Sequence, residues 1–487
     1  MTRHDFEMVI GIEVHCQLKT QSKLFCPSST AFGDDPNSHI SEVNLALPGA
    51  LPVLNKEAVR LAVLAGLALD CDIQQTSVFS RKNYFYPDLP KGYQISQFDK
   101  PICLGGHLDI DVEGTQKRIG ITRIHMEEDA GKLVHQGADS IKGATHSLVD
   151  LNRAGTALIE IVSEPDIRSA AQARAYVEGL KMIVQHIDVC DGNLEEGSLR
   201  ADINISVRKK GETSFGTRAE IKNVNSFRSI EKAIEVEFKR QTALVLAGEA
   251  VIQETRNFDE ATQTTTSLRG KEEAHDYRYF PEPDLPPLVI TADELADYKA
   301  ELPELPAMKL KRYQDDYALT SHECKVLLQD VSMGHFFTDV ISQVTSAKPK
   351  KVALWITGEL NAAIKEKQVD FSSLPISSQQ VADLCDAIDT GKVSGKMAKD
   401  VQVACFGSSF SVADVIAQMG GGQISDTSEL EAVVQDILKA NMDVVAKIKA
   451  GKTNSANFLM GQVMKLTKGR AKPDTVLQLI LDAVKQF

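Results

Sequence analysis

Strict alternation of apolar and polar residues in two neighbouring segments is the feature that most constrains this chain. In residues 200–208 four apolar side chains alternate with Arg200, Asp202, Asn204, Ser206 and Arg208. Residues 216–223 repeat the pattern, with Arg218, Glu220 and Lys222 on the polar side. Side chains alternate between the two faces of a strand, and the intervening KKGETSFG is typical of a hairpin connection. We therefore expect two adjacent antiparallel strands that carry acids and bases on one face.

The segment 9–18, VIGIEVHCQL, predicts a third strand with a polar face. Glu13, His15 and Gln17 share one side of it, and Ile12 and Val14 lie on the other. A carboxylate and an imidazole two residues apart on a rigid strand can converge on one metal ion. The alternative is a half-exposed strand with an ordinary polar outer face.

Two further acids lie in strand-like segments. Glu128 follows Thr122, Ile124 and Met126 in the same parity, and Glu160 lies in the apolar run ALIEIV. A carboxylate is costly to bury there unless it is paired or bound to metal. Pairing with Arg123, Arg153 or Arg168 is the competing explanation.

Together these residues predict a Mg²⁺ and nucleotide site, because Mg²⁺ prefers carboxylates, water and substrate phosphate as ligands. The candidate ligands are Glu13, His15, Glu128, Glu160, Asp202 and Glu220. Phosphoryl transfer also needs cations at the oxygens that gain charge. The candidates for contacts with the nucleotide are Lys82, Arg153, Arg200, Asn204 and Lys222, and the expected catalytic residues are Glu13, Glu128, Arg200 and Lys222.

Familiar nucleotide and hydrolase motifs are absent. The G-K-T at residues 451–453 has Ala446 where a P-loop requires its first glycine. No G-x-S-x-G elbow occurs in the sequence. A nucleotide site in this chain is therefore of another kind, and no amidase nucleophile is evident.

The texture of the sequence changes along the chain. Up to about residue 290 it is typical of an antiparallel α+β fold, with helices expected at 56–69, 170–189 and 229–246. The proline cluster at 281–287 ends this region. Helix-forming residues follow, and a small helical tail includes helices expected at 429–439 and 475–484. We expect three domains: a catalytic one at 1–292, a helical one at 293–405 and a tail at 406–487.

Composition limits the possible partners. The chain has 54 Lys and Arg and 67 Asp and Glu, which gives a net charge of −13. This charge opposes general binding of nucleic acid, and we expect no DNA partner. Residues 451–473 nevertheless carry +5, which predicts either a local tRNA contact or a solvated helix face. The basic residues in this run are Lys452, Lys465, Lys468, Arg470 and Lys472.

Two other expectations follow from composition. The eight cysteines are scattered without a C-x-x-C pair, so we expect reduced thiols. The longest aliphatic run, 61–69, is about half of the ~20 residues that span a bilayer. Without a basic, apolar leader, this indicates a soluble, cytoplasmic protein with no membrane partner.

Several long phrases carry a specific resemblance. In chain order they are VIGIEVHCQL, LPGALPVLN, RKNYFYPDLPKGYQISQ, HMEEDAGK, SLVDLNRAGTALIEIVSEPD, EEGSLRADINISV, EIKNVNSF and DYRYFPEPDLPPL. These stretches resemble the GatB family, and GKTNSANFLMGQVMKLTKGRAKP is similar to that family's YqeY-type tail. The resemblance spans nearly the whole chain.

The resemblance implies an antiparallel-sheet cradle of the glutamine synthetase and guanidino kinase type, then an all-α domain and a YqeY-like tail that contacts tRNA. It implies ATP- and Mg²⁺-dependent activation of the side-chain carboxylate of glutamyl- or aspartyl-tRNA. The implied partners are misacylated tRNA, an amidase A subunit that supplies ammonia, and a small C subunit, in a heterotrimer. The family's metal positions fall on Glu13, His15, Glu128, Glu160, Asp202 and Glu220.

The chain departs from the family's pattern near its N-terminus, and two rival functions remain open. Some family members carry a four-cysteine zinc knob, but FCPSST keeps only Cys26 and HISEVN supplies no cysteine, so we expect no zinc. One rival is a stand-alone Mg²⁺-dependent ligase or kinase that acts on a small molecule. The other is a tRNA-docking scaffold whose acids only form ion pairs.

Overall fold

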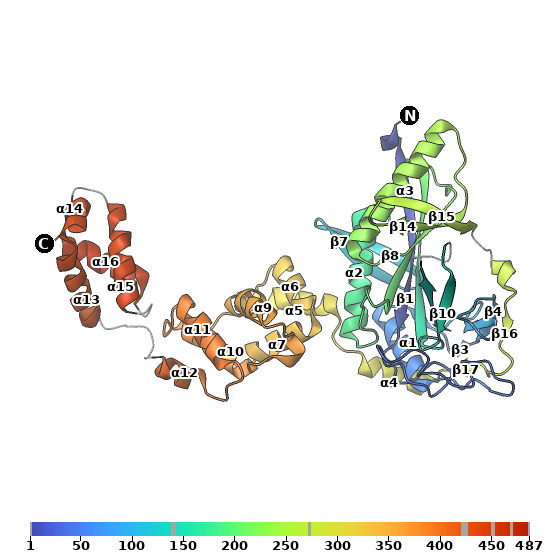
Figure 1. Cartoon of the computed structure of the whole chain (residues 1–487), viewed down its shortest axis with the longest axis horizontal. Helices are drawn as coiled ribbons and strands as arrows, with labels where there is room; N and C mark the ends of the chain where they lie inside the picture. The colour runs from blue at the N-terminus through green and yellow to red at the C-terminus, as the bar shows by residue number, and fades with distance from the viewer. Residues whose placement is uncertain are drawn as a thin grey trace. The chain divides into compact units, whose positions relative to one another are not determined.

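The computed structural model describes residues 2–137, 143–270, 274–419, 427–449, 453–467 and 471–485. The chain divides into two compact units, residues 1–306 and 307–487 (Figure 1). The first unit contains the large sheet, and the second is helical.

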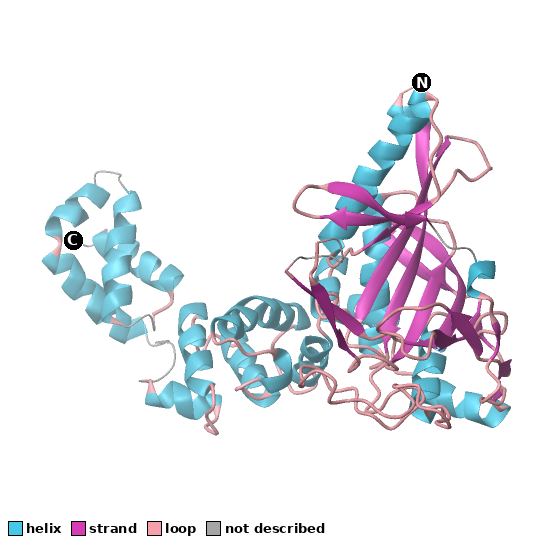
Figure 2. Ribbon diagram, turned by 45° about the vertical axis from the view of Figure 1, so that its right-hand side comes forward, coloured by secondary structure: helices cyan, strands magenta, loops and turns pink. Residues whose placement is uncertain are grey.

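One thirteen-stranded sheet dominates the first unit (Figure 2). Every pair of neighbours in it is antiparallel except β13 and β14. Along the main path its strands are β15 (Thr264–Gly270), β14 (Glu254–Asp259), β13 (Ala219–Lys222), β12 (Leu199–Lys209), β1 (Phe6–Gln17), β11 (Ala157–Ser163), β8 (Thr115–Glu128), β5 (Tyr93–Ser96), β4 (Ser80–Asn83) and β16 (Phe280–Pro281). Off this path lie β2 (Asp72–Ile73), β6 (Cys103–Leu104) and β7 (His107–Val112).

Two small ladders and several helices complete this unit. The ladders pair β9 (Lys132–Gln136) with β10 (His146–Asp150), and β3 (Thr76–Ser77) with β17 (Leu288–Val289). The helices are α1 (Lys56–Ala68), α2 (Ala170–His186), α3 (Phe227–Ala247) and α4 (Ala292–Glu301), with short 3₁₀ turns η1 (Arg3–Asp5) and η2 (Ala274–Tyr277). The first three confirm the helices predicted at 56–69, 170–189 and 229–246.

The apolar face of the sheet is covered by helices, and this fixes the direction of the polar face. Ile12, Val14 and Cys16 of β1 are fully buried in one core with Tyr176 and Val177 of α2. Helix α2 packs on β1 and β7, α3 packs on β12, and α1 packs on β8. Because side chains alternate along each strand, Glu13, His15 and Gln17 lie on the opposite face, as the sequence predicted.

Gly66 in α1 is required for close packing of that helix. A Cβ at this position would lie 2.4 Å from Cys103 Sγ and 2.7 Å from Ile73 Cδ1. We predict that Gly66→Ala destabilises the first unit by about 1–3 kcal/mol through overpacking, which exceeds the gain of roughly 1 kcal/mol in helix propensity. Chemical denaturation measures this. As a control, Gly461→Ala should not destabilise the protein, because a Cβ there meets nothing within 4 Å; equal effects at the two sites would refute the packing account.

The second unit is built from helices, and it has no strand in its described part, as expected for residues 293–405. Its helices are α5 (Pro306–Tyr317), α6 (Ser321–Leu328), α7 (Val331–Ile341), α8 (Pro349–Leu354), the π-helix η3 (Trp355–Leu360), α9 (Asn361–Glu366), the 3₁₀ turn η4 (Phe371–Ser373), α10 (Ser378–Asp389), α11 (Gly395–Cys405), α12 (Val412–Gln418), α13 (Thr427–Ala440), α14 (Met442–Lys449), the 3₁₀ turn η5 (Thr453–Ser455), α15 (Ala456–Leu466) and α16 (Pro473–Val484). The helices α13 to α16 share a separate core that includes Leu438, Leu459 and Ile480. Helices α13 and α16 confirm those predicted at 429–439 and 475–484.

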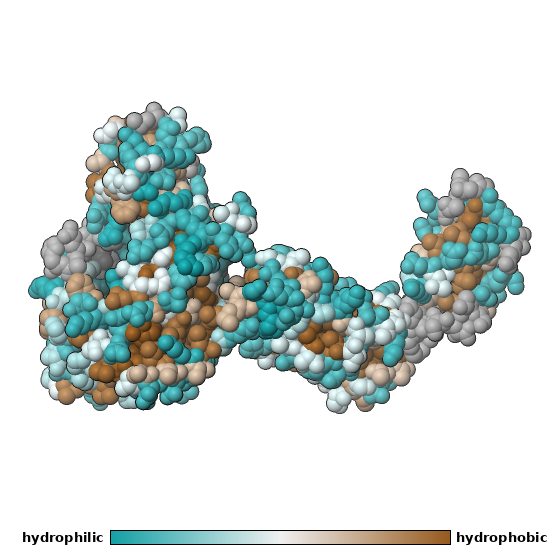
Figure 3. All heavy atoms as spheres, turned by 180° about the vertical axis from the view of Figure 1, so that it is seen from behind, coloured by the Kyte–Doolittle hydropathy of each residue, from teal (hydrophilic) through white to brown (hydrophobic). Residues whose placement is uncertain are grey.

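Apolar side chains remain exposed in parts of both units (Figure 3), including Phe32, Leu51 and Val53 between β1 and α1. Within the described residues, no helix combines the length and apolar character needed to cross a membrane.

Helix α4 packs on α1, and the first compact unit runs to Pro306. The division into 1–292, 293–405 and 406–487 stays a prediction.

Candidate active site

Antiparallel register brings polar residues from four strands into one row. His15 of β1 lies opposite Glu160 of β11 and opposite Arg200 of β12, and Glu160 lies opposite His125 of β8. Directly paired residues of antiparallel strands share a face of the sheet. The row His125, Glu160, His15 and Arg200 therefore runs across the polar face in the middle of the sheet.

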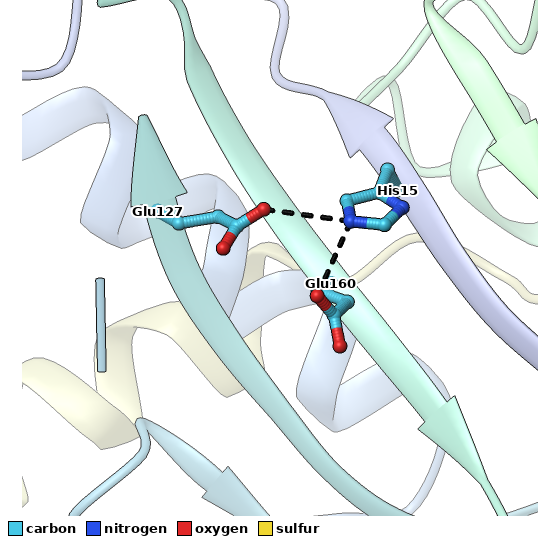
Figure 4. A group of neighbouring side chains, drawn as sticks. All are labelled: His15, Glu127 and Glu160. Carbon is cyan, nitrogen blue, oxygen red and sulfur yellow. Dashed lines mark ion pairs between the residues drawn. The ribbon is translucent and has the colours of Figure 1, made fainter. Parts of the chain in front are cut away.

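His15, Glu127 and Glu160 form a compact cluster on this face (Figure 4). His15 Nε2 lies 3.2 Å from Glu160 Oε2 and 3.5 Å from Glu127 Oε1. His125 Nε2 flanks the same two carboxylates, at 3.5 Å from Glu127 and 3.7 Å from Glu160. Arg123 Nε donates to His125 Nδ1 at 3.3 Å, so Nε2 is the ring nitrogen of His125 that faces the acids.

The charges of the cluster stabilise one another. Burial opposes the charged form of His15, but the hydrogen bond to Glu160 and the charges of Glu160, Glu127 and Asp202 raise its pKa to about 9. Burial also opposes ionisation of Glu160, and the charges of His125 and His15 hold its pKa well below the usual range. Burial likewise opposes ionisation of Glu127, but its hydrogen bond to His125 and the charge of His15 lower its pKa. Both carboxylates are therefore ionised at neutral pH, and their negative charge can attract a cation.

A second set of polar side chains continues the face toward β13. Asn204 Nδ2 donates to Glu13 Oε1 at 2.9 Å, and Lys222 Nζ lies 2.5 Å from Asp202 and 3.6 Å from Glu220. Burial opposes the charge of Lys222, but Asp202 and Glu220 outweigh it and raise its pKa. Two strands thus hold acids and a base in contact, as their alternation predicted.

Asp129 anchors the other end of the row. This buried carboxylate accepts hydrogen bonds from Arg200 Nη2 at 3.0 Å and from Gln17 Nε2 at 3.1 Å. Arg153 Nε lies 3.5 Å from the same carboxylate. Burial opposes the charge of Arg200, and Asp129 together with Glu127 and Asp202 raises its pKa, so the guanidinium keeps a fixed position beside the cluster.

Two adjoining hollows open on this face, and both are lined by His15, Lys82, Asp202 and Lys222. The first, of about 300 Å³, is also lined by Glu127, Asp129, Arg200 and the loop 223–225, and we call it the arginine hollow. The second, of about 290 Å³, we call the aromatic hollow. Its further lining residues are Glu13, Gln97, Phe98, Arg123, His125, Glu160, Arg218, Glu220, Thr255, Tyr277 and Tyr279.

The structure brings most of the predicted site residues together. Those that line the hollows are Glu13, His15, Lys82, Glu160, Arg200, Asp202, Glu220 and Lys222. Asn204 contacts Glu13 from the same face. Glu160 is held by His15 and His125, whereas two of the arginines considered as its partners bond elsewhere: Arg153 to Ala130 O and Gly131 O, and Arg168 to Pro165 O and Ile167 O.

Glu128 and Arg153 line neither hollow. Glu128 shares the parity of Ile124 and Met126, which belong to the core face. Its carboxylate pairs with the Lys91 ammonium and accepts from Ile95 N at 2.9 Å. Glu127, and not Glu128, therefore lies beside His15; the role of Glu128 as a metal ligand stays a prediction. Arg153 reaches the edge of the site only through Asp129.

Sequence reasoning missed Glu127, His125 and Asp129. The signal was present in the parity of β8, since Ile124 and Met126 are apolar and must face the core, which turns His125 and Glu127 outward. Asp129 follows the end of the strand, where alternation gives no direction. For the basic tail, Lys465 and Lys472 are exposed; Lys452, Lys468 and Arg470 lie outside the described residues.

The donor set fits a divalent cation. One imidazole nitrogen and two carboxylate oxygens, from His15, Glu127 and Glu160, lie within 4.8 Å of one another. A site for Mg²⁺ or Mn²⁺ needs a few such oxygens and completes its shell with water and substrate phosphate. The residues that could hold a metal are therefore these three, with Glu13 and Asp202 on the neighbouring row of strand pairs.

Comparison with known protein families gives two matches. The model of the GatB/GatE catalytic domain family matches residues 8–296, which include every residue of the two hollows. The model of the GatB domain family matches residues 335–484, in the helical unit.

Full-length relatives agree with these matches. The chain is 49% identical over 480 residues to a protein of Thermosynechococcus vestitus, covering 98% of this chain and 96% of the relative. It is 49% identical to one of Carboxydothermus hydrogenoformans (99% and 100% covered) and 51% identical to one of Trichlorobacter lovleyi (98% of each). All three relatives are named as the B subunit of an aspartyl/glutamyl-tRNA(Asn/Gln) amidotransferase.

Proposed function

The chain belongs to the GatB family of tRNA-dependent amidotransferase B subunits, and from this we propose that its sheet face activates the side-chain carboxylate of glutamyl- or aspartyl-tRNA with ATP. The observation that carries the proposal is the cluster of His15, Glu127 and Glu160 between the two hollows. It combines an anionic centre for a cation with nearby Lys and Arg side chains for phosphate and carboxylate.

The proposed reaction has two steps. An oxygen of the side-chain carboxylate attacks the γ-phosphorus of ATP, the bond to the β-phosphate oxygen breaks, and ADP leaves. Ammonia then attacks the acyl carbon and expels phosphate, which gives the amide. The first step is needed because phosphate is a far better leaving group than oxide.

Residues of this chain would supply position and charge rather than covalent chemistry. Arg200 and Lys222 line the arginine hollow, where each forms an ion pair with an acid of this chain. They would neutralise the side-chain carboxylate of the substrate as it approaches the phosphate. Asp129, Asp202 and Glu220 hold these cations in place, which reduces the cost of reorganisation in the transition state. A divalent cation held by His15, Glu127 and Glu160 would supply positive charge near the phosphate oxygens.

Water must be kept from the activated carboxylate, because hydrolysis would return the starting material. Lys82, Tyr84 and the loop at residues 223–225 all line the arginine hollow. Burial raises the pKa of Tyr84, with the neighbouring acids Glu127, Glu128 and Asp129 adding to the effect. Tyr84 therefore stays neutral and serves as a wall that donates a hydrogen bond rather than as a base.

The test is amidation by the reconstituted complex, with both misacylated tRNAs and with ATP and Mg²⁺ each omitted in turn. We expect product only when both are present. Amide formation without ATP would contradict the proposal. Turnover of ATP by the isolated chain without tRNA would favour a stand-alone ligase or kinase, and binding of tRNA without any ATP-dependent reaction would favour a scaffold.

Further proposals concern the partners and the tail of the chain. The partners would be an amidase A subunit that supplies ammonia and a small C subunit. The basic tail, with exposed Lys465 and Lys472, would contact tRNA. The cradle type of the sheet and a cytoplasmic location also stay predictions.

A further inference from the structure

Thr255 of β14 makes a buried hydrogen bond to an acid of the site. Strands β13 and β14 are parallel neighbours, and Glu220 lies opposite Thr255 in their register. Thr255 Oγ1 donates to Glu220 Oε2 at 2.6 Å, and the two residues are 2% and 7% exposed. This distance is typical of a hydroxyl that donates to a charged carboxylate, which is among the stronger hydrogen bonds in proteins. One oxygen of Glu220 is therefore fixed by a neutral donor.

The other oxygen of Glu220 faces Lys222. Lys222 Nζ lies 3.6 Å from Glu220 Oε1 and forms a closer ion pair with Asp202, at 2.5 Å. Lys222 and Asp202 line both hollows, and Thr255 and Glu220 line the aromatic hollow. Because Thr255 holds Oε2, Glu220 offers Lys222 a single oxygen. The ammonium therefore keeps its closer contact with Asp202, at the wall that the two hollows share.

The backbone beside Thr255 is anchored on the helix side of the sheet. The next residue, Arg256, is 8% exposed and takes the opposite face, because neighbouring side chains of a strand alternate. Its Nη2 donates to Thr265 O at 2.6 Å, and its Nε lies 3.4 Å from Glu237 Oε2 of α3. The register of β14 with β15 also shifts between Thr255 and Arg256, an irregularity of the kind that re-aims side chains beside active sites. Contacts outside both hollows thus hold the Thr255 hydroxyl in place.

We propose that Thr255 is a positioning residue of the amidation reaction, whose hydroxyl holds Glu220 so that Lys222 stays in place to neutralise the side-chain carboxylate of the substrate. The inference rests on the proposed function, in which Lys222 acts on that carboxylate. Without the hydroxyl, the buried carboxylate of Glu220 loses a donor and draws the Lys222 ammonium toward itself. The ammonium then leaves its position beside Asp202. Thr255 touches no reacting atom and acts only through Glu220.

The test is the rate of amidation by the full complex with Thr255→Val, which keeps the shape of the side chain and removes the hydroxyl. A misplacement of about 1 Å can cost on the order of 100-fold in rate, so we expect kcat to fall roughly 10- to 100-fold. KM for misacylated tRNA and for ATP should change little, because the lost contact acts in the transition state. Thr255→Ala also lacks the hydroxyl and should lose as much. Unchanged kcat in these variants would overturn the proposal.

Rescue and a matched control separate positioning from a structural role. Thr255→Ser retains the hydroxyl and should keep kcat near the wild-type value; a loss as large as that of Thr255→Val would contradict the proposal. The control is Thr265→Val, because Thr265 Oγ1 also donates to a buried carboxylate, Glu237 Oε2 at 2.9 Å, and lines neither hollow. It should lower the free energy of unfolding and leave kcat of the folded complex unchanged. An equal fall in kcat at both positions would make the effect of Thr255 structural and refute its positioning role.

A double-mutant cycle tests whether Thr255 acts through Glu220. Glu220→Gln should lower kcat by itself, because it removes the charge that the hydroxyl positions. Thr255→Val should then have little further effect in the Glu220→Gln background, since residues that act as a unit are not additive. Two effects that multiply as independent factors would contradict the proposal.

Failure of this positioning role and failure of the proposed function are distinguishable. A complex that amidates tRNA with ATP and is unaffected by Thr255→Val overturns the role of Thr255 alone. A wild-type complex that forms the amide without ATP overturns both. Chemical denaturation of each variant checks that the protein is folded at the temperature of the assay.

Discussion

Replacing Glu160 with Gln is expected to slow amidation of misacylated tRNA on the order of 100- to 1,000-fold, the range found when one preorganised hydrogen-bond donor is removed from an oxyanion hole. Glu160 contacts both His15 and His125 from the centre of the sheet. Gln keeps the size of the side chain but removes the negative charge that the site offers to a cation. The initial rate of amide formation, measured with saturating ATP and Mg²⁺, tests this.

A matched control lies four residues away on the same segment. Glu164 is exposed and accepts a hydrogen bond from Thr122 Oγ1 at 2.7 Å, outside both hollows. Glu164→Gln should therefore amidate at the wild-type rate. Equal rates for the two variants would mean that the cluster is a structural ion-pair network, as a scaffold requires.

The neighbouring residues Glu127 and Glu128 should respond to substitution in opposite ways. Glu127 faces the cluster, so Glu127→Gln should lower the rate of amidation on the order of 100-fold or more. Glu128 forms a buried pair with Lys91 on the core face, where the side chains are 3% and 8% exposed. Glu128→Gln leaves the ammonium unpaired and should destabilise the protein on the order of 3 kcal/mol.

The two variants are compared by amidation rate and by chemical denaturation of the same preparations. At a temperature where both are folded, Glu128→Gln should keep substantially more activity than Glu127→Gln. The reverse result, with activity lost only in Glu128→Gln and stability unchanged, would return Glu128 to the active site and contradict the register of β8.

The contrast between these residues explains how far the sequence could predict the site. Alternation placed Glu13, His15, Asp202, Glu220 and Lys222 correctly, because each lies in a strand whose apolar partners define the core face. The same rule applied to β8 assigns Glu127 to the site, since Ile124 and Met126 are buried. Glu128 shares the parity of these two core residues, so alternation alone does not place it on the polar face, and its role as a metal ligand stays a prediction.

Other features could not be predicted because they depend on pairing between distant strands. Glu160 meets His15 only because β11 lies beside β1 in the register that pairs these two residues. Phe98 and Tyr279 stack across about 180 residues of sequence. Helix positions were easier, since their apolar spacing is local: α1 begins at Lys56 as predicted.

The central claim is that the side-chain carboxylate itself attacks ATP, and an oxygen-transfer measurement tests it most directly. Misacylated tRNA with ¹⁸O in the side-chain carboxylate is converted by the complex, and the released phosphate is analysed by mass. The account predicts that each phosphate carries one oxygen from the carboxylate, because ammonia expels the phosphate together with that oxygen. Unlabelled phosphate, released at the same rate as the amide forms, would contradict the account.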